Sequence, residues 1–335
     1  MRIAFFDTHG FEKTAFDGAN ASLQRPHQIA YMEPRLTAES VIMARGYEAV
    51  CAFANCKVSG PVLESLAAGG TRLVLLRSAG FNHCDVAAAS RLGLKVARVP
   101  EYSPYAVAEH AVALLLTLNR KIHRAHARVH EMNFSLDGLV GFDLHGKTCG
   151  VIGTGRIGRA AARIFTGFGC RVLAHDPSED PGLKALGVQY VPLIDIYGQC
   201  DVITLHVPLT PQTLHMIDHK ALSLMKPSVY LVNTGRGRLI DTPALVHALK
   251  AKRVGGAALD VYEEEEGVFF NDLSQQGLQD DQLARLLTFP NVLITSHQGF
   301  LTHEALSGIA TTTLANASDF EAGKALVNEV VVSPG

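Results

Sequence analysis

The feature that most constrains the fold of this chain is a glycine-rich segment at residues 153–158, which reads Gly-Thr-Gly-Arg-Ile-Gly. It follows a short apolar run, Thr148–Ile152, and precedes a segment with helically spaced apolar residues, Arg159–Phe168. The glycines therefore fall where a buried strand would turn directly into a helix. A G-x-G-x-x-G pattern is weak evidence alone, but this strand–turn–helix context is the one that phosphate binding requires.

Each glycine has a separate task in such a turn. Gly153 permits the tight bend, Gly155 lets a ligand approach the backbone, and Gly158 lets the helix pack closely on the strand. The amides of Arg156 and Ile157 would then face a pyrophosphate at the positive end of the helix. The segment thus predicts a dinucleotide site.

An acidic residue follows at the distance expected for ribose binding. Asp176 ends the next predicted strand, 23 residues after Gly153. A carboxylate there accepts hydrogen bonds from a free ribose 2′-hydroxyl and repels a 2′-phosphate, which favours NAD over NADP. The alternative is a glycine-rich turn in a sheet protein that binds no ligand.

Short apolar runs alternate with longer amphipathic segments along the chain, which predicts parallel sheets covered by helices. Within the first hundred residues, the predicted strands are Ile3–Phe6, Ala49–Phe53, Leu73–Leu76 and Val96–Val99. The second series of predicted strands is Thr148–Ile152, Arg171–His175, Val202–Val207, Val229–Asn233, Gly256–Asp260 and Asn291–Thr295. Six parallel strands, each entered from a helix, fit a doubly wound sheet.

Between the two series of predicted strands, the alternation of short apolar runs and amphipathic segments is interrupted. Residues 104–132 carry apolar positions at helical spacing with no glycine and no proline after Pro104, which predicts one long helix. It could connect two lobes, contribute to an oligomer interface, or be an ordinary domain helix. The following residues, 133–145, are expected to form a loop, and Thr302–Gly323 is helical in pattern.

Composition excludes several classes of protein. A chain of 335 residues suggests two domains. Its formal charge of −2 argues against a nucleic-acid binder held by a general basic field, and its hydrophobic fraction of 47% is ample for buried cores. We expect no membrane span and no secretory signal. Six cysteines without a C-x-x-C pair suggest reduced thiols in the cytoplasm.

Polar residues follow three predicted strands of the second series, where ligands bind in open α/β sheets. Arg236 lies between two glycines and could hold a carboxylate with its planar guanidinium. Asp260 ends the next strand and leads into four glutamates, residues 263–266, of which three are expected to be solvated. His297 follows the last strand and could be a general acid or base. Spacing alone does not establish which glutamate would pair with it.

These segments resemble the D-isomer-specific 2-hydroxyacid dehydrogenase family, and the resemblance is closer to its fermentative D-lactate dehydrogenase branch. It rests first on residues 153–158, 233–237, 259–263 and 296–300. Further segments also correspond: Arg77–Asn82, Val99–His110, Asn119–Ala125 and Phe269–Phe270. At Gly235 the branch often has serine instead.

The resemblance implies a role for each residue of the site. Arg236 would bind the substrate carboxylate and carbonyl, His297 would donate the proton, and Glu265 would be the carboxylate partner of His297. The implied substrate-site residues are Phe53, Ser78, Ala79, Tyr102 and Phe300. The implied cofactor-site residues are Gly153, Gly155, Arg156, Ile157, Gly158, Asp176, Val207, Pro208, Asn233, Thr234, Gly235 and Asp260. No metal ligand is implied.

The resemblance also implies two Rossmann-like domains, with an NAD-binding domain at 102–298 inserted into a substrate domain built from 1–101 and 299–335. The implied activity is reduction of pyruvate to D-lactate with NADH by a homodimer or homotetramer. Alternatives are a dehydrogenase for another small D-2-hydroxy acid and a non-enzymatic NAD-sensing corepressor-like protein.

A serine hydrolase is disfavoured, because Ser78 and Ser296 lie outside any G-x-S-x-G turn. A metal site lacks support as well, since His123 and His126 lie in no H-E-x-x-H motif.

Overall fold

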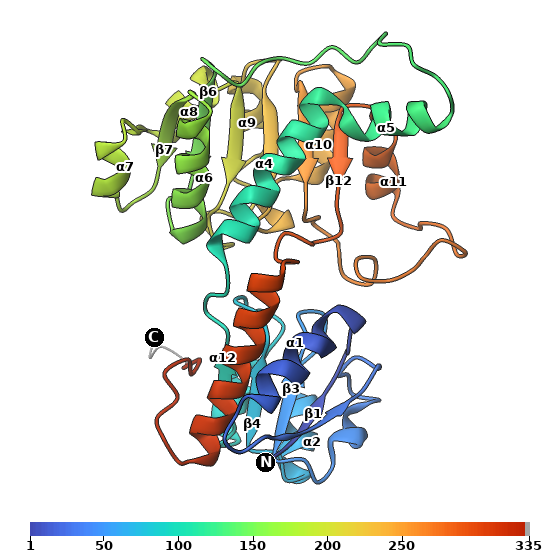
Figure 1. Ribbon diagram of the computed structural model, residues 1–335, viewed down its shortest axis with the longest axis vertical. Helices are drawn as coiled ribbons and strands as arrows, with labels where there is room; N and C mark the ends of the chain where they lie inside the picture. The colour runs from blue at the N-terminus through green and yellow to red at the C-terminus, as the bar shows by residue number, and fades with distance from the viewer. Residues whose placement is uncertain (332–335) are drawn as a thin grey trace. The chain divides into compact units, whose positions relative to one another are not determined.

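The computed structural model describes residues 1–331, and the chain divides into two compact units (Figure 1). Unit 1 comprises Met1–Ser103 and the chain from Leu301 onward, and unit 2 comprises Pro104–Phe300. The last four residues of the predicted substrate domain, 332–335, lie outside the described residues. Within the described residues, no helix is long and apolar enough to cross a bilayer.

Unit 1 is built on a five-stranded parallel sheet with the order β2-β1-β3-β4-β5. The strands are β1 (Arg2–Phe5), β2 (Gln28–Tyr31), β3 (Ala49–Ala52), β4 (Leu73–Leu76) and β5 (Lys95–Arg98). The helices are α1 (Gly10–Ala21), η1 (Val41–Ala44), α2 (Gly60–Ala68), α3 (Val86–Arg91) and α12 (His303–Glu321). Helix α12, from the end of the chain, packs along α1 and against β4 and β5 (Figure 1). Unit 1 is thus discontinuous in sequence.

Unit 2 contains a seven-stranded parallel sheet with the order β12-β11-β10-β9-β6-β7-β8. The strands are β6 (Thr148–Ile152), β7 (Arg171–His175), β8 (Gln189–Tyr190), β9 (Val202–Leu205), β10 (Tyr230–Asn233), β11 (Gly256–Leu259) and β12 (Val292–Ile294). The helices are α4 (Pro104–Arg120), α5 (Ile122–His130), α6 (Arg156–Gly167), α7 (Pro181–Ala185), α8 (Leu193–Gln199), α9 (His219–Leu224), η2 (Gly237–Leu239), α10 (Thr242–Lys250) and α11 (Asp281–Leu287). The strand order reverses between β6 and β9, where doubly wound sheets bind ligands. The predicted fold class, two doubly wound parallel sheets, is confirmed.

The sheet of unit 2 separates two hydrophobic cores, because successive side chains of a strand point to opposite faces. On β10, Leu231 packs with α8–α11, whereas Val232 packs with α4 and α6. Several helices of this unit begin where a side chain caps the first turn: Asp180, Asp218, Asp241 and Asp280 each accept a hydrogen bond from the amide three residues ahead. These capping bonds mark where the four helices start.

The prediction of one helix across residues 104–132 is wrong. The chain breaks at Lys121, which has a left-handed φ of 51°, so that α4 ends and α5 begins in a new direction. Contacts distant in sequence hold this break: the Asn119 side chain bonds both the amide and the carbonyl of Phe142, and Lys121 Nζ donates to Val140 O. Tertiary bonds override helix propensity here.

Strands β2 and β8 and helix α1 were not predicted from the sequence. Strands β2 and β8 are edge strands with exposed or half-buried residues, so neither presents a buried apolar run. Helix α1 contains two glycines, which obscure its pattern. The second sheet therefore has seven strands rather than the predicted six.

Candidate active site

The glycine turn after β6 is shaped by close backbone approaches. Gly153 has φ +90°, and a Cβ atom there would lie 2.7 Å from the carbonyl of His206. A Cβ atom on Gly158 would lie 1.8 Å from Gly153 O, whereas one on Gly155 meets nothing within 4 Å. The first and third glycines are therefore needed for packing. The second leaves open space at the N-terminus of α6, as a pyrophosphate requires.

Asp176 is fixed beside this turn at the end of β7. Its Oδ2 accepts a 2.7 Å hydrogen bond from the amide of Thr154, and its Oδ1 accepts a 2.8 Å bond from the amide of Ser178. The half-buried carboxylate is thus held next to the open turn. Together with the space at Gly155 and the start of α6, this arrangement fits a dinucleotide whose ribose lies against Asp176.

Val207 and Pro208 follow β9 on the neighbouring strand end. Val207 contacts the turn, since a Cβ atom on Gly153 would lie 2.8 Å from its Cγ1. Pro208 is exposed. Both lie at the carboxyl edge of the sheet, close to the point where the strand order reverses.

The loop after β10 presents Arg236. The buried Asn233 side chain closes this loop, donating to Arg236 O at 2.9 Å and accepting from the Gly235 amide at 3.0 Å. Gly237 is required by packing, because a Cβ atom there would lie 2.0 Å from Tyr262 O. Arg236 is half-buried, and its Nη1 donates to Gly235 O at 2.8 Å. Its remaining donors are available for a carboxylate.

The other residues of this loop differ in how tightly they are packed. Thr234 is buried, with 7% of its surface exposed. A Cβ atom on Gly235 would come no closer than 3.5 Å to its neighbours, which is ordinary contact. A Cβ atom is therefore accommodated there, so packing does not require glycine at this position.

Asp260 at the end of β11 organises the next two strand ends. Its Oδ1 accepts hydrogen bonds from His110 Nε2 at 3.1 Å, Thr295 Oγ1 at 2.5 Å and the Gln298 amide at 2.9 Å, while Oδ2 accepts from the Gly299 amide at 2.8 Å. Burial alone would raise the pKa of this carboxyl, but the hydrogen bonds from His110 and Thr295 outweigh it and the pKa is lowered. Asp260 is therefore an ionised anchor for the loop after β12.

His297 lies in that loop and pairs with Glu265. His297 Nδ1 is 2.9 Å from Glu265 Oε1, and both side chains are about one-quarter exposed. The histidine has a left-handed φ of 52°, held by a 2.7 Å bond from its amide to Asp260 O. Glu265 is oriented in turn, because its Oε2 accepts from the Tyr262 amide at 3.2 Å. An imidazole beside a fixed carboxylate at a strand end can exchange a proton with a ligand.

One prediction about the glutamate run is wrong: Glu263 is not solvated. Its Oε1 lies 2.5 Å from His215 Nε2, and its Oε2 accepts from the Thr242 amide at the start of α10. Burial opposes ionisation, but the bonds from Thr242 and His215 lower its pKa. Glu264 and Glu266 are exposed. Alternate residues of the run thus face inward.

The remaining predicted residues are divided between the two units. Phe53, Ser78, Ala79 and Tyr102 belong to unit 1, and Phe300 to unit 2. Phe53 is buried and the other four are half-buried. Ser78 and Ala79 follow β4 at the carboxyl edge of the first sheet, where Ser78 Oγ donates to Gly80 O and Arg98 Nη1 to Ala79 O.

Sequence reasoning assigned no role to His110 on α4 or to Arg77 after β4. His110 bonds Asp260, 150 residues away, and Arg77 forms a buried ion pair with Glu12, 65 residues away. No local pattern indicates partners at such distances.

The comparisons with known proteins agree with this geometry. Residues 112–299 match the family model described as D-isomer specific 2-hydroxyacid dehydrogenase, NAD binding domain. The chain is 50% identical over 321 residues to 2-hydroxyacid dehydrogenase homolog 1 of Schizosaccharomyces pombe, covering 96% of each chain. It is 47% identical over 331 residues to D-lactate dehydrogenase of Escherichia coli, covering 99% of this chain and 100% of that protein.

Solved structures are similar over the same length. The apo-structure of D-lactate dehydrogenase from Escherichia coli has a TM-score of 0.91 at 46% identity, covering 99% of this chain and 100% of that one. A structure described as the pyruvate reductase of Chlamydomonas reinhardtii has a TM-score of 0.93 at 40% identity, covering 98% of both chains.

Proposed function

Since the chain belongs to the D-isomer-specific 2-hydroxyacid dehydrogenase family and is an NAD-dependent oxidoreductase, we propose that it reduces pyruvate to D-lactate with NADH. The observation that carries the proposal is the placement of Arg236 and the His297–Glu265 pair along one edge of the sheet that also bears the glycine turn. The relatives named D-lactate dehydrogenase and pyruvate reductase support pyruvate as the substrate.

Different residues of the chain bind the cofactor and the substrate. The turn at Gly153, Gly155 and Gly158, with Asp176, would hold NAD, which supplies the hydride when it is bound. Arg236 binds the substrate carboxylate through two parallel hydrogen bonds, which its fork-shaped guanidinium allows. This clamp orients the carbonyl carbon for reaction.

His297 donates and accepts the proton of the reaction. Because Nδ1 is directed at Glu265, Nε2 is the nitrogen left to face a ligand. The protonated ring stabilises the negative charge that develops on the carbonyl oxygen and donates the Nε2 proton to it. In the reverse direction, neutral His297 accepts the proton of the hydroxyl group. Glu265 holds the ring in this orientation and stabilises its charged form.

The test is initial NADH oxidation with pyruvate, 2-oxobutyrate, phenylpyruvate, hydroxypyruvate and glyoxylate, with chiral analysis of the product. We expect pyruvate to have the highest kcat/KM and the product to be D-lactate. A tenfold preference for phenylpyruvate, or an L-product, would overturn the assignment. Turnover of another small 2-oxo acid in place of pyruvate would support the alternative of a related dehydrogenase.

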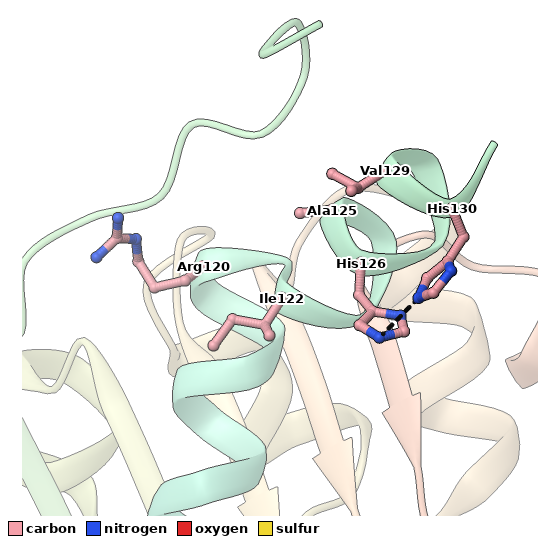
Figure 2. Close-up of a pocket in the computed structure, with 6 residues that line it drawn as sticks. All are labelled: Arg120, Ile122, Ala125, His126, Val129 and His130. Carbon is pink, nitrogen blue, oxygen red and sulfur yellow. Dashed lines mark hydrogen bonds between the residues drawn. The ribbon is translucent and has the colours of Figure 1, made fainter. Parts of the chain in front are cut away.

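We also propose that the protein forms a homo-oligomer through the segment that begins with α5. Its large apolar side chains are strongly exposed at Ile122, Val129, Met132, Phe134, Leu136 and Val140, of which Figure 2 shows the first two. A short segment that exposes so many large apolar side chains is typical of an interaction site, and a second copy of the chain is the simplest symmetric partner. Phe134→Asp with Leu136→Asp should lower the mass measured by light scattering to that of a monomer.

The six cysteines are free and buried, which supports a reducing compartment such as the cytoplasm.

A further inference from the structure

We propose that Glu263 is a positioning residue that fixes the loop bearing Arg236 relative to the segment bearing Glu265. This inference rests on the proposed function, which gives those two residues their roles. The side chain of Glu263 is only 11% exposed, and it has two partners on different segments of unit 2. Its Oε1 lies 2.5 Å from His215 Nε2, and its Oε2 accepts a 3.1 Å hydrogen bond from the amide of Thr242. One carboxylate therefore joins the chain before α9, the start of α10 and the chain that follows β11.

The partner His215 is also bonded to the chain that leaves the loop after β10. Its amide donates to Arg238 O at 2.8 Å, and the amide of Ile217 donates to Leu239 O at 3.0 Å. His215 has a left-handed φ of 50°, which costs energy in a residue other than glycine and persists only where surrounding contacts enforce it. The bond to Glu263 is one such contact, so it acts on a segment that lies directly beside the loop.

The backbone that carries Glu263 touches the same loop and also carries the partner of the proton donor. A Cβ atom on Gly237 would lie 2.0 Å from Tyr262 O and 2.5 Å from the Glu263 amide nitrogen, so the two stretches of backbone are in contact. Two residues later, Glu265 accepts from the Tyr262 amide and pairs with His297. Residues 262–265 thus contact the carboxylate-binding loop through Glu263 and the acid–base histidine through Glu265.

Stability alone does not call for a carboxylate at this position. Burial opposes the ionisation of Glu263, and only its hydrogen bonds from Thr242 and His215 lower its pKa. An apolar side chain of similar volume would fill the space without the cost of removing a charge from water. Two carboxylate oxygens with fixed partners instead provide directional bonds, which precise placement of a binding loop requires. The Thr242 amide, in the first turn of α10, also lacks a partner within its own helix.

The test compares Glu263→Ala with Glu263→Gln in pyruvate reduction and in the binding of oxamate, a pyruvate analogue, to the complex with NADH. Alanine removes both bonds, whereas the glutamine amide can accept from Thr242 and donate to a neutral His215. We expect kcat/KM for pyruvate to fall about 10- to 100-fold in the alanine variant, because the guanidinium is misplaced. Oxamate binding should weaken in parallel, with KM for NADH unchanged. The glutamine variant should retain most of the activity, as should the control Glu264→Ala on the exposed position beside it.

A double-mutant cycle with His215→Asn separates positioning from general damage. Asparagine tolerates a left-handed φ, but its shorter side chain cannot reach the carboxylate of Glu263. If the pair acts as one link, the double variant should lose no more kcat/KM than Glu263→Ala does. Additive losses, or equal losses in the alanine and glutamine variants, would overturn the proposal. Should Glu263→Ala fail to fold, a loss in His215→Asn that is absent from Glu263→Gln supports the link, and no loss in either contradicts it.

Amide hydrogen exchange provides a readout that needs no turnover. Exchange in residues 237–242 should be faster in Glu263→Ala than in the unmodified protein, whereas exchange in α6 should not change. Absence of pyruvate reduction by the unmodified protein would count against the proposed function. Unchanged exchange in residues 237–242 would count separately against the role of Glu263, whichever acid is the substrate.

Discussion

Arg77 and Arg236 follow strands at the carboxyl edges of the two sheets, yet their surroundings are opposite. Arg77 is 2% exposed, and its Nε and Nη2 donate to the two carboxylate oxygens of Glu12 at 2.7 and 3.1 Å. Its guanidinium also lies over the ring of Phe5, 4.1 Å from the centroid. Arg236 is half-buried, and among the described residues only Gly235 O accepts a bond from its guanidinium.

This difference separates a structural cation from one available to a ligand. Arg77 is buried and its charge is compensated within the protein by the bidentate carboxylate of Glu12. Its Nη2 also donates to Asp7 O, which ties β4 to the loop after β1. The surroundings of Arg236, in contrast, fix only the backbone of its loop. The same residue type at equivalent topological positions therefore affects stability in one unit and, we propose, activity in the other.

The largest effect should come from Glu12→Gln. The substitution removes the charge that compensates the buried Arg77, and leaving one buried ion without its partner costs about 3–5 kcal/mol of unfolding free energy. Urea denaturation at pH 7 measures this loss. Glu64→Gln on α2 is the control, since Glu64 is exposed and its replacement should change stability by less than about 0.5 kcal/mol. A loss below about 1 kcal/mol in Glu12→Gln would show that Arg77 does not depend on its partner.

Arg236→Lys should affect activity instead. Lysine keeps the positive charge but lacks the planar fork, so a bidentate clamp fails. We expect kcat/KM for pyruvate to fall at least about 100-fold, which corresponds to about 2.7 kcal/mol of transition-state stabilisation. NADH affinity and the urea midpoint should remain unchanged. The exposed neighbour Arg238, replaced by lysine, provides the control, and near-normal turnover of Arg236→Lys would exclude the clamp.

The sequence predicted the parts of this comparison that depend on neighbouring residues. The glycine turn, the buried strands and the loop around Arg236 all have local signals, because close backbone approach demands glycine and sheet cores demand apolar runs. The Arg77–Glu12 pair and the bond from His110 to Asp260 had none, since their partners are brought together only by the folded sheet. The break at Lys121 and the inward orientation of Glu263 depend on tertiary bonds in the same way.

Two histidines at the edge of the second sheet extend the comparison. His206 follows β9 and has no acidic partner in the bonds described; burial lowers its pKa to about 4, and its Nε2 lies 2.9 Å from Thr204 Oγ1. At pH values below the usual histidine pKa of 6.5, His206 binds a proton in the unfolded chain but not in the folded chain. The free energy of unfolding therefore falls as the pH drops from 7 toward 4. His206→Gln should reduce this pH-dependent loss of unfolding free energy by about 1–2 kcal/mol. Urea denaturation of both proteins at pH 7 and at pH 4.5 measures the difference. Parallel pH dependences for both proteins would contradict a neutral His206.

The second histidine, His297, should respond to its carboxylate. Glu265→Gln removes the negative charge that stabilises the protonated ring but keeps a hydrogen-bonding shape. Pyruvate reduction needs the protonated ring, so the decline of turnover at alkaline pH should begin at a lower pH in this variant, while activity at acid pH suffers least. Glu264→Gln, on the exposed position beside it, should leave the profile in place. A shift in the Glu264 variant, or in neither, would mean that the pairing has no role in proton transfer.

The smallest effect concerns Asp176, whose charge is fixed by the structure yet open to a ligand. Both of its oxygens accept backbone amides, at 2.7 and 2.8 Å, so the carboxylate cannot turn away from a 2′-phosphate. The unmodified protein should therefore prefer NADH to NADPH by more than about tenfold, and Asp176→Ala should reduce that ratio chiefly by improving kcat/KM for NADPH. Asp180→Ala is the control, because this carboxylate caps α7 and binds Arg159. If the alanine variant lost NADH activity without gaining any with NADPH, repulsion of the 2′-phosphate would not be the role of Asp176. Its role would then be structural, like that of Arg77, because its bond to the amide of Thr154 would hold the shape of the turn.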